Sequence, residues 1–351
     1  MTIPPVLRAL LTAHGPSGYE TAPAAVFRDA ASAFADVSTD VMGSVWARVP
    51  GTAGGPTLAI VGHIDEIGLI VSHIDDDGFL RFHGVGGWDP QILVGQRVLL
   101  GTRDGTVPGV VGKKPIHLLK EEERKQVARL EEMHIDIGAA SGEEARSLVR
   151  VGDVAVIEGE PIELPNGRAV SRSMDNRLGA YVAYEAARLV HEAGGAPGDT
   201  VAVAAVQEET TFGGATTTAY ALRPDVAIVV DVTHATDAPG VEVNELGAHP
   251  FGSGPVIERG SNLNPRVVEI MYETAESESI PYTLQASARS TGTDLDAMHL
   301  SRGGIPAGGV GLPLRYMHSP VEMVQLDDID KAARLVAAVA QRLTAETSFA
   351  R

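Results

Sequence analysis

Residues able to bind metals or move protons follow the ends of several apolar stretches in this 351-residue chain. His63 and Asp65 close the apolar run LAIVGHID, and residues i and i+2 of a strand point the same way. The pair predicts a metal-binding His63 whose second ring nitrogen is oriented by Asp65. A hydrogen-bonded core histidine explains this fragment, taken alone, equally well.

Acidic residues occupy three comparable places. Asp175 opens the helical stretch SRSMDNRLGAYVAYEA, where an ordinary N-cap is the better explanation for it in isolation. Glu208 and Glu209 follow the apolar run VAVAAVQ, and neighbouring carboxylates repel each other unless a cation or a proton compensates. Such a pair suits one metal ligand and one general base. Asp231 ends the run AIVVDVT, where burying a carboxylate is costly unless it is paired or bound to a metal.

His318 lies in LPLRYMHSP, after a glycine-rich stretch that predicts a loop. Each of these signals is weak alone. Together, the residues lie at the ends of strands in one sheet or at the starts of the helices that follow them, which is where α/β proteins bind ligands. The candidate ligands are two histidines and three carboxylates: His63, Asp175, Glu209, Asp231 and His318.

This ligand set is what a two-metal hydrolase needs. Asp175 would bridge the ions, with His63 and Asp231 completing one site and Glu209 and His318 the other. In such sites the ions lie about 3.5–4 Å apart and share a hydroxide that acts as the nucleophile. Glu208 would take the proton from that water and later give it to the leaving amine.

The elements that must position these residues alternate between strands and helices. LAIVGHID, TVAVAAVQ and PDVAIVVDVT predict buried strands, and residues 176–193 and 214–222 have helical periodicity. We therefore expect an α/β fold with a mostly parallel sheet flanked by helices. An amphipathic helix from Asp327 onward would close it.

A change of pattern between residues 68 and 168 predicts a small β-rich insertion, because short alternating segments there are separated by Gly, Asp and Pro. The predicted domains are therefore residues 1–67 with 169–351, and an inserted domain at 68–168. Within the insertion, KEEERKQVARLEEM has the pattern of a solvated helix or a mobile flap.

Composition narrows the function classes. The 28 basic residues against 46 acidic ones give a net charge of −18, which disfavours nucleic acid and anionic membranes as partners. The chain has no cysteine, so His, Asp and Glu must hold any metal. No export signal or long apolar segment is present, which predicts a cytoplasmic protein.

Eight motifs carry a resemblance to a known family over nearly the whole chain. They are GPSGYE (15–20), GHIDEIG (62–68), Gly86-Gly87, DIGA (136–139), MDNR (174–177), QEE (207–209), GTD (292–294) and RYMHSPVE (315–322). In this order they are similar to the glutamyl and leucyl aminopeptidases of the tetrahedral (TET) type, co-catalytic metallopeptidases once often called endoglucanases.

The resemblance implies the same site that the residues themselves suggest. It implies a peptide substrate, two divalent ions per subunit, zinc or cobalt, with Glu208 as catalytic base and Asp65 supporting His63; the implied ligands are His63, Asp175, Glu209, Asp231 and His318. It also implies a zinc-peptidase-like catalytic domain interrupted by a β-barrel-like dimerisation domain. Dimers of this family commonly assemble into hollow dodecamers, so a homo-oligomer, with a tetrahedral dodecamer as one form, is implied here.

One departure from the family pattern lies beside the predicted base. The family usually continues after the glutamate pair with Val-Gly and a basic residue before Gly-Ala, whereas this chain has TTFGGA at 210–215. The ligands are unaffected, but the shape of this turn, and with it specificity or turnover, is expected to differ.

Three rival functions remain at this point. Another dinuclear amide hydrolase, such as a deacylase or a carboxypeptidase, would use a related site. A glycosidase would need two carboxylates set across a sugar and no metal. An inactive peptide-binding scaffold would have no need of such a costly group of carboxylates.

Overall fold

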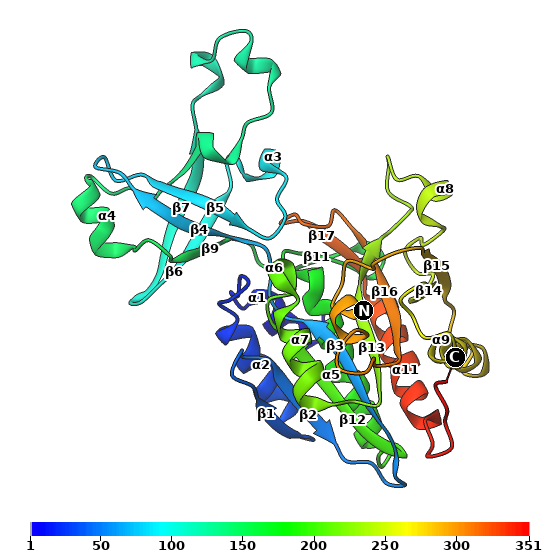
Figure 1. Cartoon of the computed structure of the whole chain (residues 1–351). Coiled ribbons are helices and arrows are strands. Elements are labelled where there is room, and N and C mark those ends of the chain that lie inside the picture. The colour runs from blue at the N-terminus through cyan, green and yellow to red at the C-terminus, as the bar shows by residue number, and fades with distance from the viewer. Residues whose placement is uncertain (1, 351) are drawn as a thin grey trace.

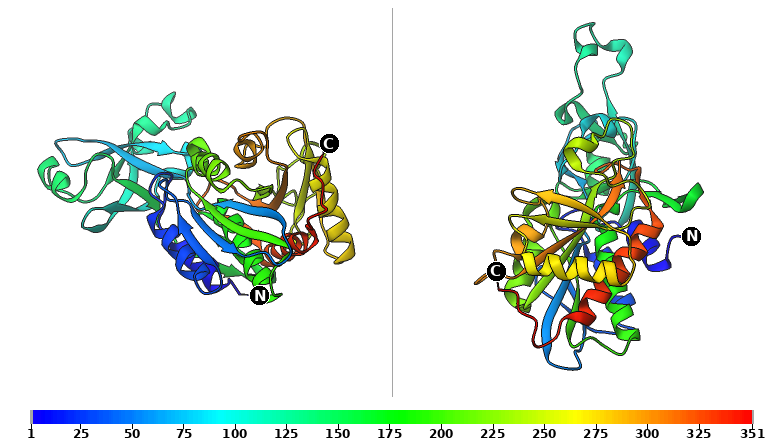
Figure 2. Two further views of the ribbon diagram at one scale, coloured as in Figure 1. Left: turned by 60° about the horizontal axis from the view of Figure 1, so that its bottom comes forward. Right: turned by 90° about the vertical axis from the view of Figure 1, so that its right-hand side faces the viewer.

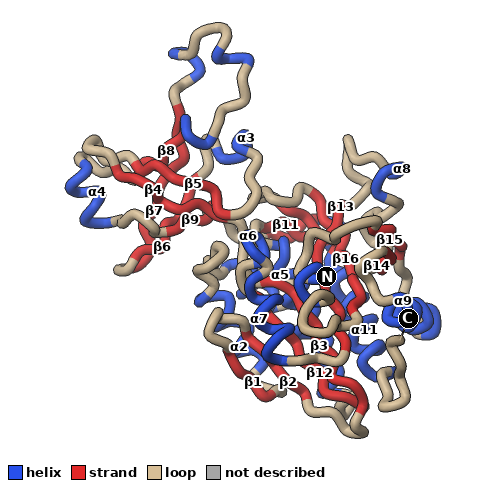
Figure 3. Tube along the Cα trace, viewed as in Figure 1, coloured by secondary structure: helices blue, strands red, loops and turns tan. Residues whose placement is uncertain are grey.

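The apolar β-branched runs of the sequence form two separate groups of strands, drawn in red in Figure 3. The structure is a computed structural model and describes residues 2–350. One group is an 11-stranded sheet and the other is a closed barrel, and each has its own cluster of buried apolar side chains. In Figure 1 the barrel lies at the upper left of the larger unit.

The large sheet has a parallel centre and antiparallel flanks. Its neighbours run in the order β1-β2-β12-β3-β13-β16-β17-β11-β10, with β14 pairing to β16 and β15 to β14. Only the central strands β12, β3, β13 and β16 are parallel neighbours along this path, so the predicted mostly parallel sheet is in fact a mixed one. The bounds are β1 Asp36–Thr39, β2 Val45–Val49, β3 Gly55–His63, β10 Ile162–Leu164, β11 Arg168–Ser171, β12 Gly198–Ala205, β13 Val226–His234, β14 Val256–Gly260, β15 Thr283–Ser287, β16 Ala307–Arg315 and β17 Glu322–Gln325.

Helices cover both faces of this sheet, which explains why most residues of the four central strands are buried. The long helices α5 and α11 pack against each other, and Figure 2 shows them with α9 beside the strands. The helical bounds in this unit are α1 Pro5–Thr12, α2 Thr21–Ala31, α5 Met174–Glu192, α6 Glu208–Thr211, α7 Gly213–Leu222, α8 Val243–Leu246, α9 Pro265–Ser277, α10 Leu295–Met298 and α11 Leu326–Arg342.

Close packing of α5 on β3 depends on a pair of glycines. A Cβ on Gly62 would lie 2.2 Å from the backbone carbon of Gly179, so any side chain there would push the helix away from the strand. Because the start of α5 carries Asp175 and the end of β3 carries His63, this close approach brings two predicted ligands within reach of each other.

The barrel lies between β3 and β10 in the sequence. Its strands run in the order β4-β5-β8-β7-β6-β9 and enclose leucine, isoleucine and valine side chains. The bounds are β4 Gly68–Ile74, β5 Leu80–Val85, β6 Arg97–Thr102, β7 Gly105–Lys113, β8 Met133–Asp136 and β9 Val154–Ile157, with the helices α3 Pro90–Leu93 and α4 Gly142–Leu148.

The charged segment between β7 and β8 projects away from the rest of the molecule (Figures 1 and 2). The predicted solvated helix in KEEERKQVARLEEM is wrong, because this stretch contains only the 3₁₀ turns Glu123–Lys125 and Leu130–Glu132. Its charged pattern lacks the apolar face that would anchor a helix on the barrel, and short isolated helices are marginal in water.

The described residues contain no helix that is both long and apolar enough to cross a bilayer.

Candidate metal centre

The first two predicted residues lie where the central strands end. His63 is the last residue of β3, and β13 runs parallel to β3 with Val229 paired to Val61. Two residues further along, Asp231 therefore lies level with His63 at the same edge. Both side chains are buried, and so is Asp65, whose Oδ1 lies 3.3 Å from Nδ1 of His63. His63 thus faces a carboxylate on one ring nitrogen and keeps Nε2 toward the cluster.

Asp175 faces two imidazoles rather than capping its helix. Its Oδ1 lies 3.3 Å from Nε2 of His63, and its Oδ2 lies 3.3 Å from Nε2 of His318. The capping role that the sequence favoured for Asp175 belongs to its neighbour, because Oδ1 of Asn176 accepts the N–H of Gly179 at 2.9 Å. The peptide bond between Asp175 and Asn176 is cis. Because Asn176 supplies this cap, the Asp175 carboxylate can lie between the two histidines.

The short helix α6 presents the predicted base and its neighbour. The backbone N–H groups of Glu208 and Glu209 donate to the two oxygens of Asp65, each over 3.1 Å. Ser17 donates its hydroxyl to the same carboxylate. Asp65 therefore holds both the ring of His63 and the start of α6, which places Oε2 of Glu208 3.6 Å from Nε2 of His63.

His318 reaches the cluster from the loop after β16. Its Nε2 lies 3.3 Å from Oε1 of Glu209 and is shared with Asp175. Its other ring nitrogen, Nδ1, lies 2.9 Å from the carbonyl oxygen of Gly87, and a carbonyl can only accept, so Nδ1 carries the proton of the neutral ring. That tautomer leaves a lone pair on Nε2. Gly87 lies after β5, so the barrel orients a side chain of the large unit.

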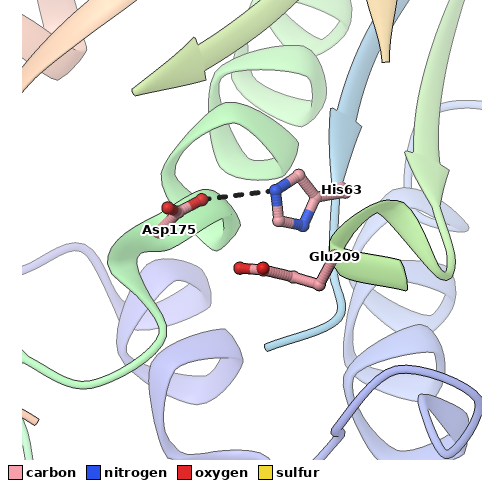
Figure 4. A group of neighbouring side chains, drawn as sticks. All are labelled: His63, Asp175 and Glu209. Carbon is pink, nitrogen blue, oxygen red and sulfur yellow. Dashed lines mark ion pairs between the residues drawn. The ribbon is translucent and has the colours of Figure 1, made fainter. Parts of the chain in front are cut away.

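The five predicted ligands and the predicted base meet in one place. Figure 4 shows three of the side chains converging from β3, the start of α5 and α6. His63, Asp175 and Glu209 each offer a ligand atom within 4.8 Å of the others, and His63, Glu208 and Asp231 do the same. His63 belongs to both groups. Imidazole nitrogens with carboxylate oxygens are a donor set suited to zinc and related divalent ions.

The buried carboxylates of the cluster lie close together, and their negative charges need compensation by protons or cations. Burial raises the pKa of Glu208 to about 10, and although His63 lowers it, the charge of Asp231 adds to the rise. Burial likewise holds the pKa of Asp231 well above its ordinary value. Hydrogen bonds to Asp175 and Glu209 raise the pKa of His318 to about 11. Without a metal the cluster therefore retains protons to offset its carboxylates, and divalent ions would serve the same purpose.

Two acidic residues that the sequence analysis gave no role complete the surroundings. Buried Glu322 accepts the backbone N–H of His318 at 2.9 Å and that of Asp175 at 3.2 Å, so it ties two predicted ligands to β17. Asp294 is buried, and neither of its carboxylate oxygens has a hydrogen-bond partner among the described residues. Both lie in quoted motifs, RYMHSPVE and GTD, but only the motif membership hinted at them.

The segment after His63 is pinned by a buried ion-pair network. Arg177, fully buried, donates from its Nε to the carbonyl of Ile64 at 3.0 Å and from a terminal nitrogen to Glu66 at 2.8 Å. Arg172 pairs with the other oxygen of Glu66. Because each buried charge has a partner, this network holds the turn carrying Asp65 in one arrangement.

The turn at residues 210–215 joins α6 to α7 through Phe212. This residue has a φ of 53°, in the left-handed region, and its side chain contributes to the wall of the cavity beside the cluster. That cavity has a volume of about 470 Å³ and is lined by His63, Asp175, Glu208, Asp231 and His318, together with residues of β14, β15 and the loop before α10. It is large enough for an amino-acid side chain and part of a peptide.

Comparisons with known proteins show the family and the fold of the chain. The family model for M42 glutamyl aminopeptidases matches residues 43–335. The chain is 34% identical over 350 residues to a lysyl aminopeptidase of Pyrococcus furiosus, covering 96% of each chain. A TET aminopeptidase structure from a marine sediment thaumarchaeote is 37% identical, has a TM-score of 0.92 and is matched over 97% of both chains. The TET1 peptidase of Pyrococcus horikoshii, which can assemble into a tetrahedron or a large octahedral shell, is 29% identical with a TM-score of 0.83, matched over 95% of this chain and 98% of its own.

Proposed function

The chain belongs to the M42 glutamyl aminopeptidase family, and from that premise we propose that it removes amino-terminal residues from peptides with the help of two divalent metal ions. The observation that carries this proposal is the placement of the Asp175 carboxylate between His63 and His318, with one oxygen 3.3 Å from each ring. A carboxylate so placed is suited to bridge two ions.

The proposed ligands divide into two sets that share Asp175. His63 and Asp231 would complete the first set, and Glu209 and His318 the second. Zinc and cobalt are the proposed ions, because both accept nitrogen and oxygen ligands in open sites. When bound, the two ions would polarise the scissile carbonyl and lower the pKa of a water molecule.

Glu208 would act as the general base. Its carboxylate is not one of the five proposed ligands, yet it lies 3.6 Å from Nε2 of His63 and so borders the reacting atoms. It would accept the proton of the attacking water on a carboxylate oxygen and return that proton to the leaving amine nitrogen. The hydrogen bond from the backbone N–H of Glu208 to the Asp65 carboxylate would keep the base in place.

The assembly and location follow as further parts of the proposal. Residues 68–168 would form a dimerisation domain inserted into a catalytic domain of residues 1–67 and 169–351. The dimers would assemble into a larger homo-oligomer, as the TET1 peptidase of Pyrococcus horikoshii can. We place the protein in the cytoplasm, acting on peptides rather than on nucleic acid or membranes.

A substrate panel combined with metal reconstitution tests the activity. The purified protein is dialysed against a chelator, reloaded with Zn²⁺ or Co²⁺, and its metal content is measured by elemental analysis. We expect about two ions per chain and hydrolysis of aminoacyl anilides only after reloading. Matched anilides with an acetylated α-amino group should not be cleaved. Cleavage of the acetylated substrates, or release of carboxy-terminal residues, would instead favour a deacylase or a carboxypeptidase.

A further inference from the structure

Glu258 is a buried carboxylate in the wall of the cavity beside the metal centre. The residue is only 8% exposed and lines the same cavity as His63 and Glu208. Among the described residues, no hydrogen bond or ion pair joins its carboxylate to another side chain or to the backbone. A buried charge without a partner is costly, so a carboxylate kept at such a place points to a partner that arrives with a ligand.

The position of Glu258 in the sheet aims it at the cavity. β14 runs antiparallel to β16 with Ile257 paired to Val310, so the next residue, Glu258, comes opposite Gly309. A Cβ on Gly309 would lie 2.8 Å from Oε2 of Glu258, which shows that the carboxylate lies directly over this glycine. Asp231 is paired to Gly311, two residues from Gly309, so Asp231 and Glu258 lie on the same face of the sheet.

The surroundings of Glu258 favour a cation. Burial raises its pKa to about 7, and the charge of nearby Asp296 adds to the rise. Asp296 accepts the backbone N–H groups of Thr291 and Gly292 and the amide of Asn262, which keep its pKa low despite partial burial. No lysine or arginine is found among the described residues that line this cavity. An arriving ammonium or guanidinium group would therefore meet a negative, unneutralised site.

We propose that Glu258 binds the cationic side chain of an amino-terminal lysine or arginine, so that this chain prefers peptides with a basic first residue. The inference rests on the proposed aminopeptidase function and adds the substrate class. An acidic first residue would be repelled by Glu258 and Asp296. An apolar one would leave the Glu258 carboxylate buried without a partner, and such unpaired groups are what make polar sites selective.

The substrate preference is tested with lysyl, arginyl, leucyl and glutamyl anilides on the metal-loaded protein. We expect kcat/KM to be at least about 30-fold higher for the lysyl and arginyl substrates than for the leucyl one, as for a buried charge pair. Equal or better cleavage of the leucyl or glutamyl anilide would overturn the inference and leave the aminopeptidase proposal standing. Cleavage of none of the four would overturn the aminopeptidase proposal itself.

A binding measurement separates the side-chain site from catalysis. L-lysine and L-norleucine have straight side chains of the same carbon count and differ in the terminal ammonium, so calorimetric titration of both isolates the contribution of that charge. We expect L-lysine to bind the wild-type protein at least about 30-fold more tightly than L-norleucine. Equal affinities would contradict a carboxylate that recognises the cation.

Three variants locate the effect. Glu258→Gln removes the charge with little change of shape, and Gly309→Ala keeps the charge but displaces the carboxylate. Both should reduce the lysine-to-norleucine affinity ratio about tenfold or more. The control Glu269→Gln removes a charge from an exposed position of α9 and should keep the wild-type ratio. A wild-type lysine-to-norleucine affinity ratio in folded Glu258→Gln would refute the assignment. If Glu258→Gln does not fold, a wild-type ratio in Gly309→Ala would refute it instead.

Discussion

The backbone N–H of Glu208 donates to Oδ1 of Asp65 over 3.1 Å, and the same oxygen lies 3.3 Å from Nδ1 of His63. The second oxygen of Asp65 accepts the N–H of Glu209. One buried carboxylate therefore sets the position of a proposed ligand and of the proposed base. Of these contacts, only the one with His63 could be predicted from the sequence. The link to α6 makes Asp65 a positioning residue for both groups.

Asp65→Asn should weaken metal binding without removing a ligand. The amide keeps one acceptor oxygen but turns an N–H₂ group toward a backbone N–H or the hydroxyl of Ser17, so α6 and the ring of His63 lose their common support. We expect the affinity for Zn²⁺ to fall about 10- to 100-fold. Competition with a chromophoric chelator measures this, with exposed Asp77→Asn as the control. Unchanged affinity would show that Asp65 does not orient the ligands.

Glu208→Gln should separate turnover from metal binding. The glutamine has nearly the same shape but cannot accept the proton of the attacking water, so we expect kcat to fall about 10²- to 10⁴-fold. Elemental analysis should still find both ions, because Glu208 is not one of the five proposed ligands. Loss of one ion in this variant would make Glu208 a ligand, and normal turnover would remove it from the role of base.

His318→Ala should lower the metal content toward one ion per chain. The change removes the Nε2 atom that lies 3.3 Å from both Asp175 and Glu209, and so one of the two ligand sets loses its only histidine. His234→Ala is the matched control, because His234 lines the same cavity but is exposed and is not one of the five proposed ligands. Two ions bound to both variants would contradict the proposed division of ligands.

Much of the fold could be predicted because uninterrupted apolar runs in the sequence identify the buried strands. The runs that end in His63 and Asp231 are uninterrupted apolar segments, and the structure forms them as neighbouring central strands covered on both faces. Polar residues at the ends of such strands must come together at one edge, which is why the convergence of the ligands was foreseeable without coordinates.

The remaining parts of the site depend on contacts that no local pattern encodes. Gly87 supplies a carbonyl to His318 from 231 positions away, and Ser17 reaches Asp65 from the loop after α1. Gly87 belonged to a quoted motif, but its role as an acceptor follows only from the packing of the barrel on the large unit. The helix predicted at 120–132 is absent for a different reason. The charges there have helical spacing, but the segment has no apolar face to bury, and such spacing alone does not stabilise a helix.

Glu322→Gln tests a supporting residue that the sequence analysis missed. Its two oxygens accept the backbone N–H groups of His318 and Asp175, at 2.9 and 3.2 Å, and glutamine can accept only one of these bonds well. We expect the more weakly held of the two ions to lose about tenfold or more in affinity, again by chelator competition. The control is Glu346→Gln near the carboxy terminus, where the glutamate is exposed. Wild-type affinities in Glu322→Gln would limit this residue to a packing role.

Glu20→Gln should stabilise the protein at high pH and have less effect at low pH. Burial raises the pKa of Glu20 from 4.5 to about 7; hydrogen bonds from the backbone of Gly18 and Gln207 oppose the rise, and the charge of Asp65 adds to it. At a pH below 4.5, the ordinary pKa of the unfolded chain, the Glu20 carboxyl is protonated in both the folded and the unfolded chain. Between the two values only the unfolded chain loses its proton, so the free energy of unfolding falls as the pH rises and stays reduced above about 7.

The glutamine variant keeps an acceptor oxygen for both N–H groups and cannot ionise. Urea titrations should therefore give it a free energy of unfolding about 1–3 kcal/mol above that of the wild type at pH about 8, with a smaller difference at pH about 5. The exposed Glu131→Gln variant should show no such dependence on pH. An equal difference at both pH values would mean that Glu20 acts through packing, and that its charge does not oppose folding.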